Sequence, residues 1–370
     1  MPSLVIPASL LPLDGRFGSG PSRVRPAQLE HLVANAHLLG TSHRQAPVKD
    51  LVGRVLEGLA DFFRLPAGYE VVFGNGGSTA FWNIAAAGLA KNRSAHLSCG
   101  EFSAKCAQAH TTPWLEAPHV VTSEPGTLGE LAAIAGVDIY AWAHNETSTG
   151  VAAGVRRIAG VDAGALMVVD ATSAAGGIDF DANEVDAYYF APQKNFASDG
   201  GLWFALLSPQ AIERASEISQ SDRYIPEFLS LQAAIDNSRL NQTLNTPALT
   251  TLLLMEAQLD WMRSIGGLSA TAAHCTQTSN LLYSWAESKD TITPFVSNPA
   301  HRSPVVVTLD LDASLDASAL TQVLRDNGIV DTEPYRKLGR NQIRIATFAG
   351  VPLDDVEKLT SSIDYVLERL

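Results

Sequence analysis

The chain has 370 residues, of which 46% are hydrophobic and 18% are charged. This length exceeds what one small core needs, and the composition fits a soluble protein with a large domain and a smaller companion. The formal net charge of −13 argues against duplex nucleic acid or an anionic membrane as a partner, because either would repel the protein. An anionic substrate would therefore need locally clustered arginines.

The cysteines are few and scattered. Cys99, Cys106 and Cys275 predict neither a disulfide framework nor a metal site. No basic segment precedes Arg16, and no apolar run approaches the length of a membrane span. We therefore expect a cytoplasmic protein without a signal peptide, a membrane segment or a metal.

Apolar runs typical of strands alternate with helical patterns in the first half of the chain. The strand-like runs, in chain order, are YEVVF, SAHLS, DIYAWAH, ALMVVD and DAYYF, and the first two are followed by the helical patterns AFWNIAAAGLA and SAKCAQAHT. This alternation predicts a mostly parallel sheet with helices on both faces. Ligands of such sheets collect at the carboxyl ends of the strands.

The second half begins with a long helical pattern from Pro247 to Gly267. It continues with the run SPVVVTLDL, a helix over about 316–327, the strand QIRIATF and a last helix that starts at PLDD. These elements predict a small α+β domain formed by 1–16 and 265–370, beside a large domain over 17–264.

Two polar residues at strand ends suggest the chemistry. Lys194 follows the run DAYYF, and burial there would lower the pKa of its amine and prepare it to form an imine with an aldehyde cofactor. Asp170 closes the run ALMVVD. Together they could bind the two poles of pyridoxal phosphate. Most lysines are solvated surface charges, so Lys194 alone proves little.

A glycine-rich loop precedes the first helical pattern, in FGNGGSTAFWN at 73–83. Its backbone N–H groups, with Ser78 and Thr79 at the helix start, could bind a phosphate. It matches neither the dinucleotide fingerprint nor a P-loop. The alternative is a tight turn with a Ser or Thr cap.

Three further motifs remain open from the residues alone. Thr147 in AHNETSTGV could face a cofactor oxygen or sit in a turn capped by its own side chains. His43 and Arg44 form a pair in a loop, and a surface pair is the usual explanation of such residues. Arg344, flanked by two isoleucines, points either to solvent or into a cleft where it would clamp a carboxylate.

Eight motifs in chain order carry a resemblance to a known family. They are FGSGP at 17–21, SHR at 42–44, GNGGSTAFW at 74–82, NET at 145–147, VVDATS at 168–173, APQKN at 191–195, NTP at 245–247 and RIATF at 344–348. Together they resemble phosphoserine aminotransferases of the actinobacterial-type branch, within the class V, fold-type I pyridoxal-phosphate enzymes. The resemblance spans nearly the whole chain. It implies a large domain with a mostly parallel seven-stranded sheet.

The resemblance also implies cofactor contacts. Lys194 matches the lysine that carries the internal aldimine with pyridoxal 5'-phosphate, and Asp170 matches the aspartate that pairs with the pyridine nitrogen. The other matched positions are Gly77, Ser78 and Gln193 near the phosphate, Thr147 near the phenolic oxygen, and Phe102, which lies where many members stack a tryptophan. Asn245 and Thr246 match a segment that reaches the cofactor of a neighbouring subunit, which implies a homodimer with shared active sites.

Substrate contacts follow from the same matches. His43, Arg44 and Arg336 match contacts to the substrate phosphate, with Arg340 as an alternative to Arg336, and Arg344 matches the clamp on the α-carboxylate. The implied reaction is a ping-pong transamination between phosphoserine and 2-oxoglutarate, in serine and pyridoxine biosynthesis.

Other functions are weaker alternatives. An alanine–glyoxylate aminotransferase would share Asp170 and Lys194. A cysteine desulfurase would need a cysteine on a late loop, and none follows Cys275. An oxidoreductase would need the glycine fingerprint, and a non-enzymatic binding protein would need an inert Lys194.

Overall fold

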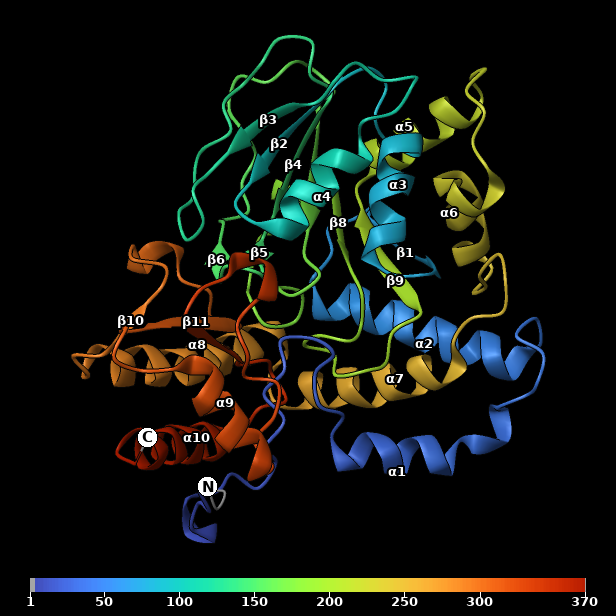
Figure 1. Ribbon diagram of the computed structural model, residues 1–370. Helices are drawn as coiled ribbons and strands as arrows, with labels where there is room; N and C mark the ends of the chain where they lie inside the picture. The colour runs from blue at the N-terminus through green and yellow to red at the C-terminus, as the bar shows by residue number, and fades with distance from the viewer. Residues whose placement is uncertain (1–3, 370) are drawn as a thin grey trace.

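The computed structural model describes residues 4–369 and contains a central seven-stranded sheet of order β1-β9-β8-β7-β4-β2-β3 (Figure 1). The strands are β1 (Glu70–Asn75), β2 (Ser94–Ser98), β3 (His119–Thr122), β4 (Ile139–Ala143), β7 (Leu166–Asp170), β8 (Ala187–Phe190) and β9 (Leu202–Leu207). Only β9 runs antiparallel to its neighbours, β1 and β8. The predicted mostly parallel, fold-type I sheet is therefore confirmed.

Helices cover both faces of this sheet because its strands are apolar on both sides. In β4, Tyr140 and Trp142 face one core and Ile139 and Ala141 face the other. The first core is closed by α2 (Ala46–Phe62) and α7 (Leu249–Ser264), with α1 (Pro26–Ala34) packed on α7. The second lies under α3 (Ser78–Gly88), α4 (Glu101–Ala109), α5 (Pro209–Ser219) and α6 (Leu231–Arg239) (Figure 1).

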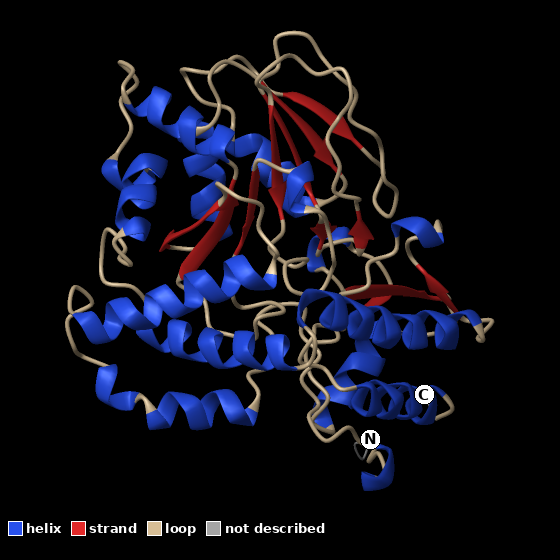
Figure 2. Cartoon of the chain, turned by 180° about the vertical axis from the view of Figure 1, so that it is seen from behind, coloured by secondary structure: helices blue, strands red, loops and turns tan. Residues whose placement is uncertain are grey.

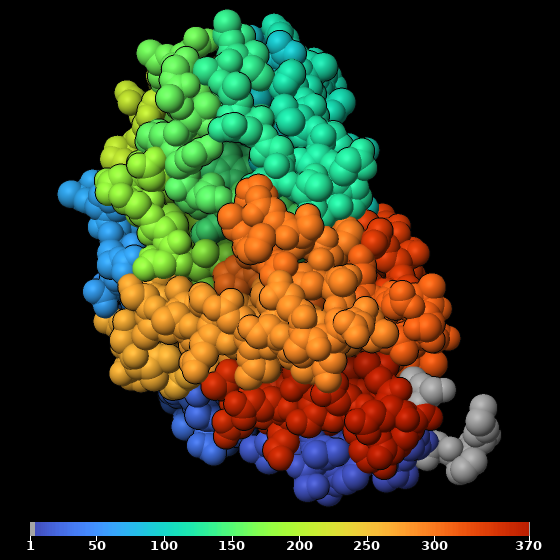
Figure 3. Space-filling model, turned by 90° about the vertical axis from the view of Figure 1, so that its left-hand side faces the viewer, coloured from blue at the N-terminus to red at the C-terminus, as the bar shows by residue number. Residues whose placement is uncertain are grey.

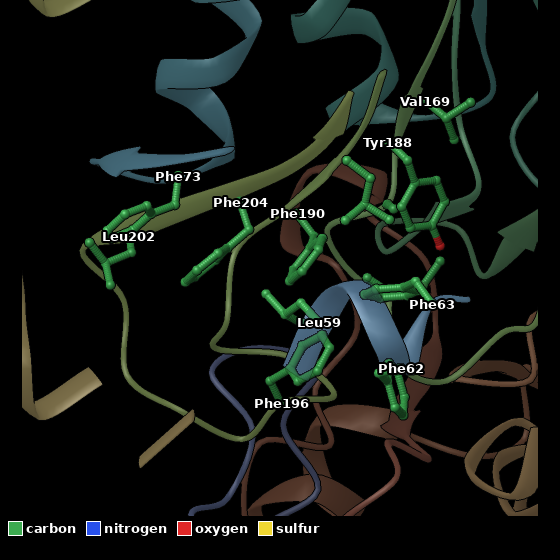
Figure 4. Packing of buried hydrophobic residues seen from close by; sticks show 14 of the residues in the cluster. Leu59, Phe62, Phe63, Phe73, Val169, Tyr188, Phe190, Phe196, Leu202 and Phe204 are labelled. Atoms are coloured by element: carbon green, nitrogen blue, oxygen red, sulfur yellow. The ribbon is translucent and has the colours of Figure 1, made fainter. Parts of the chain in front are cut away.

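A row of aromatic side chains fixes the loop that carries Lys194. Phe190 ends β8 and Phe196 follows the loop, and their rings stack with centroids 5.1 Å apart. Phe190 also stacks on Phe204 of β9, and Phe63 at the end of α2 contacts both Phe190 and Phe196 (Figure 4). All four are buried. Because both ends of the loop are anchored in the core, the backbone around Lys194 is held in place.

A second, antiparallel sheet is formed by β10 (Ile292–Pro294), β11 (Val306–Leu311) and β12 (Gln342–Ala346). It packs with α8 (Gly267–Glu287), α9 (Ala317–Asp326) and α10 (Leu353–Leu367) around a separate core (Figure 2). Ile6 and Phe17 belong to this core, so the N-terminal segment lies beside the C-terminal helices (Figure 3). The domain boundaries at 16/17 and 264/265 stay a prediction.

The helical pattern predicted from Pro247 to Gly267 corresponds to one helix, α7, which begins at Leu249. The structure ends α7 at Ser264 and starts α8 at Gly267, with Gly266 between them at φ +117°. Only glycine adopts this conformation without strain, so the chain turns there. None of the described helices is long and apolar enough to cross a membrane.

Candidate active site

Several strands end at one edge of the large sheet, and the predicted site residues follow them. Asp170 ends β7, Lys194 follows β8, and the glycine loop follows β1. The short strand β5 (Asn145–Glu146), paired with β6 (Val151–Ala152), follows β4. Since β1 and β8 both run antiparallel to β9, their carboxyl ends share this edge. The edge faces the second sheet (Figure 1).

Lys194 is covered by the N-terminal segment. Its Nζ donates a hydrogen bond to the carbonyl oxygen of Ser19 at 2.5 Å. The pKa of Lys194 is lowered to about 8, mainly by burial and also by the nearby positive charge of Arg344, while Asp170 opposes both effects. A larger fraction of this amine is therefore neutral near neutral pH than in a solvated lysine, and the neutral form is the one that acts as a nucleophile or proton acceptor.

Asp170 is held by three donors. Trp82 Nε1 donates to Oδ2 at 2.8 Å, and the backbone N–H and hydroxyl of Thr172 donate to Oδ1 at 2.9 Å and 2.5 Å. The Thr172 hydroxyl, which has one proton, must in turn accept from Ser78 Oγ at 2.6 Å. A chain of hydrogen bonds thus links the carboxylate to the start of α3.

The glycine loop leaves an anion-binding space at the start of α3. Gly76 has φ +109°, and a Cβ at Gly77 would meet no atom within 4 Å. Gly77 caps α3 without a side-chain hydrogen bond. Across residues 4–369, the N–H groups of Ser78 and Thr79 have no acceptor. Free N–H groups at the positive end of a helix, facing open space, fit a phosphate.

A second buried group of polar residues lies beside β5. Thr147 Oγ1 and Asn145 Nδ2 each lie 2.8 Å from Ser173 Oγ. Asn145 Oδ1 and Gln193 Oε1 are buried and have no partner among the described residues. Buried oxygen atoms without donors are costly. They fit a site that a polar molecule completes.

Arg344 on β12 faces this site rather than solvent. Its Nη1 donates to the carbonyl oxygen of Thr147 at 3.0 Å, and its guanidinium lies 5.4 Å from the ring centre of Tyr335. Burial lowers the pKa of Arg344, and its Nε has no partner within the described part of the chain. The structure therefore decides between the two orientations left open by the sequence, and one guanidinium edge remains free for an anion.

Phe102 lies at the start of α4 beside the segment that precedes β12. Its ring is 5.9 Å from that of Tyr335. Glu101 pairs with Lys337 in the short 3₁₀ helix η6 (Arg336–Leu338). These contacts bring Arg336 to the same side of the molecule as Phe102.

Arg336 and Arg340 have different surroundings. Arg340 donates to both carboxylate oxygens of Asp310, at 3.1 Å and 2.5 Å, and stacks on Phe295. Arg336 is exposed and has no carboxylate partner in the described range. Arg336 is therefore the freer of the two for a phosphate.

The structure does not bring His43 and Arg44 to Lys194 within one chain. They lie between α1 and α2, at the end of the molecule away from the second sheet (Figures 1 and 2). Arg44 Nη1 donates to Gln242 Oε1 at 2.7 Å, and His43 Nε2 is buried with no partner among residues 4–369. The prediction that they contact the same substrate as Arg344 therefore requires a second chain.

Asn245 and Thr246 are exposed near Gln242 and are tied to the end of β1. Asn75 Oδ1 accepts from the Asn245 N–H at 3.3 Å, and Asn75 Nδ2 donates to the Thr246 carbonyl at 3.0 Å. Both hydrogen bonds use the backbone of Asn245 and Thr246, and their side chains make none among the described residues. Their predicted role across a subunit boundary stays a prediction.

Several neighbours of the predicted residues were not identified from the sequence as part of the site. They are Ser19, Trp82, Asn145, Thr172 and Ser173. Each lies within one of the eight motifs, so the signal was present. Spacing alone does not show which side chain of a motif turns toward the site.

Comparison with known proteins agrees with this geometry. Residues 26–332 match the family model of class-V aminotransferases. Relatives aligned over the whole chain include the phosphoserine aminotransferase of Nocardioides sp., 57% identical and covered over 99% of its length, and a putative phosphoserine aminotransferase of Mycobacterium leprae, 56% identical and covered over 98%.

Solved structures share the fold at low sequence identity. The phosphoserine aminotransferase of Cytophaga hutchinsonii superposes with a TM-score of 0.87 at 22% identity, covering 95% of this chain and 98% of that one. An aspartate aminotransferase of Thermus thermophilus reaches 0.79 at 21% identity, covering 96% and 99%. The full-length relatives and the family model together show that this chain belongs to the class-V aminotransferases, among the phosphoserine aminotransferases.

Proposed function

We propose that the chain is a pyridoxal-phosphate-dependent aminotransferase that interconverts 3-phosphohydroxypyruvate and glutamate with O-phosphoserine and 2-oxoglutarate, in serine biosynthesis. The observation that carries the chemistry is the covered Lys194 amine, with a pKa near 8, close to Asp170 and Arg344. The substrate class rests on relatives that are 55–57% identical over nearly the whole chain. The proposal includes the cytoplasmic location predicted from composition.

The residues present fit the cofactor. The free N–H groups of Ser78 and Thr79 would bind its phosphate, and the open space at Gly77 leaves room for the phosphate oxygens. Asp170 would accept a hydrogen bond from the ring nitrogen, and Lys194 Nζ would hold the aldehyde carbon. When bound, pyridoxal phosphate supplies an electron sink for the charge left on the substrate Cα.

The side chains then have separate tasks. With the cofactor bound, the neutral Nζ of Lys194 would accept the proton from the substrate Cα and later give it back. Asp170, fixed by Trp82 and Thr172, would hold a proton on the ring nitrogen. Arg344 binds the α-carboxylate through its free edge, and the segment at Ser19 covers the amine and excludes water.

The second anionic group of the substrate needs further cations. Arg336 is proposed for this position because Arg340 is held by Asp310. The same cations would bind the side-chain carboxylate of glutamate and the phosphate of phosphoserine. In a ping-pong reaction both substrates occupy one site in turn, and each carries a second anionic group. A chain with net charge −13 repels such substrates unless fixed cations converge on them.

We further propose a homodimer in which His43, Arg44, Asn245 and Thr246 complete the partner's site. Support comes from their location away from the second sheet and from large apolar side chains that are exposed in one chain. Leu29 and Val33 on α1 are 50% and 75% exposed, and Tyr224 and Phe228 before α6 are 83% and 48% exposed. Exposed large apolar side chains are typical of an interface.

The test of the proposed activity is a comparison of amino donors. Purified protein with bound cofactor is assayed with O-phosphoserine and 2-oxoglutarate, and with alanine and glyoxylate. We expect kcat/KM for phosphoserine to exceed that for alanine by about 10²-fold or more, since a charge-assisted arginine–phosphate contact is lost with alanine. Equal values, or a preference for alanine, would move the protein to another class-V activity.

A further inference from the structure

A buried cluster of metal-binding residue types lies between β2 and the helix α4 that covers it (Figure 1). It consists of His96 on β2 and of Cys106 and His110 on and directly after α4. Their exposed fractions are 1%, 6% and 1%. One donor atom from each lies within 4.8 Å of the other two.

The backbone presents these donors to one another. Cys106 and His110 are four residues apart, so their side chains emerge on one face of the helix and its C-terminal turn. The His96 ring meets the His110 ring edge to face, with centroids 4.5 Å apart. The three donors thus converge from two elements of the rigid core, which favours a defined coordination geometry.

The hydrogen bonds of His110 leave one ring nitrogen free. Its Nδ1 lies 3.1 Å from the Cys106 carbonyl oxygen, which can only accept, so Nδ1 carries the proton. Nε2 then has a lone pair, and this buried atom has no partner in the described part of the chain. A backbone carbonyl that fixes one imidazole nitrogen so that the other can bind is the usual support of a histidine metal ligand.

Space for a further ligand lies next to the cluster. A cavity of about 10 Å³ is bordered by His96, Cys106 and Asp170. This volume suits a single water molecule. The nearby Asp170 carboxylate also adds negative charge beside the cluster.

We propose that His96, Cys106 and His110 bind a borderline divalent transition-metal ion of the zinc class, with a water molecule as fourth ligand. The metal displaces the proton of the Cys106 thiol, whose pKa is raised by burial and by Asp170, and the proton leaves to solvent. Two imidazoles and the resulting thiolate suit tetrahedral Zn²⁺ and do not suit Mg²⁺ or Ca²⁺, which prefer oxygen. Donor atoms on tetrahedral zinc lie roughly 3.3–3.6 Å apart, given bonds of about 2.0–2.3 Å. The donors, which lie within 4.8 Å of one another, would therefore close by up to about 1.2–1.5 Å through side-chain rotation.

This site was not predicted from the sequence, because the three cysteines are scattered and His96 is ten positions from Cys106 along the chain. Only the packing of α4 on β2 brings the residues together. The proposal does not depend on the substrate of the enzyme. None of the three residues takes part in the proposed transamination.

The experiment uses the full chain with its cofactor and Co²⁺ as the probe. Tetrahedral cobalt bound by thiolate gives intense visible bands, which octahedral surface cobalt lacks. Metal content is measured in parallel by elemental analysis after equilibration with Zn²⁺ and gel filtration. We expect about one ion per chain and the tetrahedral bands in the unsubstituted protein.

Two variants and a matched control decide the outcome. Cys106→Ala and His110→Gln should each lose the tetrahedral bands and weaken metal retention at least about tenfold. Cys275→Ala should retain both, because Cys275 is an equally buried thiol outside the cluster. If Cys106→Ala does not fold, as judged by circular dichroism, His110→Gln decides alone. Absence of tetrahedral cobalt in the unsubstituted protein, or its persistence in the folded variants, would overturn the proposal.

Discussion

Gly20 lies against the amine of Lys194, and a Cβ placed on Gly20 would be 1.9 Å from Lys194 Nζ. The same segment supplies the Ser19 carbonyl that accepts a hydrogen bond from Nζ. A residue at the start of the chain thus shapes the surroundings of a residue that follows β8. The motif FGSGP therefore borders the candidate active site, although it carries no reactive group.

This contact predicts that Gly20→Ala displaces Lys194. We expect kcat/KM to fall by about 10²-fold or more, since small displacements of a catalytic group cost that much. Gly20 also has φ +138°, so the substitution adds backbone strain. Gly136→Ala is the matched control, because Gly136 has φ +78° and an added Cβ there would meet nothing within 4 Å.

Both glycine variants should lose stability in thermal unfolding, by about 1–2 kcal/mol for the left-handed backbone. Only Gly20→Ala should also lose activity, whereas Gly136→Ala should keep the kcat/KM of the unsubstituted protein. Full activity of folded Gly20→Ala would show that the segment moves freely away from Lys194.

The second prediction concerns the pH at which Lys194 becomes neutral. Its pKa is lowered from 10.5 to about 8, first by burial and then by Arg344. In cofactor-free protein, acylation of Lys194 should therefore rise with pH and level off above about 8 rather than above 10. Mass spectrometry of pulse-labelled protein measures this rate, with the exposed Lys105 in the same digest as the reference.

Arg344→Met should shift this profile to higher pH, because one of the two causes that lower the pKa is removed. The lowered pKa of Lys194 also makes the free energy of unfolding rise with pH. Unfolded Lys194 binds a proton between about pH 8 and 10.5 that the folded protein does not, so Lys194 opposes folding less as pH rises through this range. A profile unchanged by Arg344→Met would mean that burial alone sets the pKa.

The apolar runs were sufficient for β1, β2, β4, β7 and β8 and for the residues that strand ends place at the edge of the sheet, whereas β3 and the antiparallel β9 were not identified from them. Asp170 and Lys194 each terminate or follow an apolar run, and parallel strands bring such ends together. Alternation could not orient Arg344, because the period of a strand defines two faces without saying which one meets the other domain. That choice depends on how β12 packs beside Thr147.

The spacing of residues in the sequence could not show where the remaining predicted residues lie in the fold. His43 and Arg44 match substrate contacts by motif, yet they lie between α1 and α2, at the end of the molecule away from the second sheet (Figure 1). The predicted end of the helical pattern at Gly266 and Gly267 agrees with the turn between α7 and α8, but the sequence did not predict α8 itself. Where such residues lie in the fold depends on how the whole chain packs.

The third prediction separates Arg336 from Arg340. Arg336→Ala should lower kcat/KM for O-phosphoserine by about 10²-fold, because a charge-assisted contact to phosphate is lost. Arg340→Ala removes an equal charge but breaks the pair with Asp310 instead, so its effect should stay within a few-fold. Steady-state kinetics of both variants give the answer. The reverse order would assign the phosphate to Arg340.

The fourth prediction concerns Trp82, which donates to Asp170 from α3. Trp82→Phe keeps most of the ring packing and removes the Nε1–H donor. A hydrogen bond to a charged group contributes about 1.5–3 kcal/mol. We expect faster loss of cofactor on dialysis, measured by absorbance, while the circular dichroism spectrum is unchanged. Unaltered cofactor retention would mean that the two Thr172 donors suffice.

The last prediction tests whether active sites are shared between subunits. Lys194→Ala and Arg44→Ala chains should each be nearly inactive with O-phosphoserine as homodimers. In a mixed dimer, the site that keeps Lys194 receives Arg44 from the other chain and is complete. After unfolding and refolding together, random pairing should restore about a quarter of the activity of the unsubstituted protein, since half of the dimers carry one intact site of two.

If Arg44 served the Lys194 of its own chain, no mixed dimer would contain an intact site and activity would not return. Lys194→Ala mixed with Arg336→Ala is the control, because Arg336 lies on the same side as Phe102 of its own chain and should not complement. Recovery with Arg44→Ala but not with Arg336→Ala would place the two arginines on opposite subunits of one site. Sedimentation of the mixture confirms that dimers form, so a failure to recover activity could not be attributed to a lack of pairing.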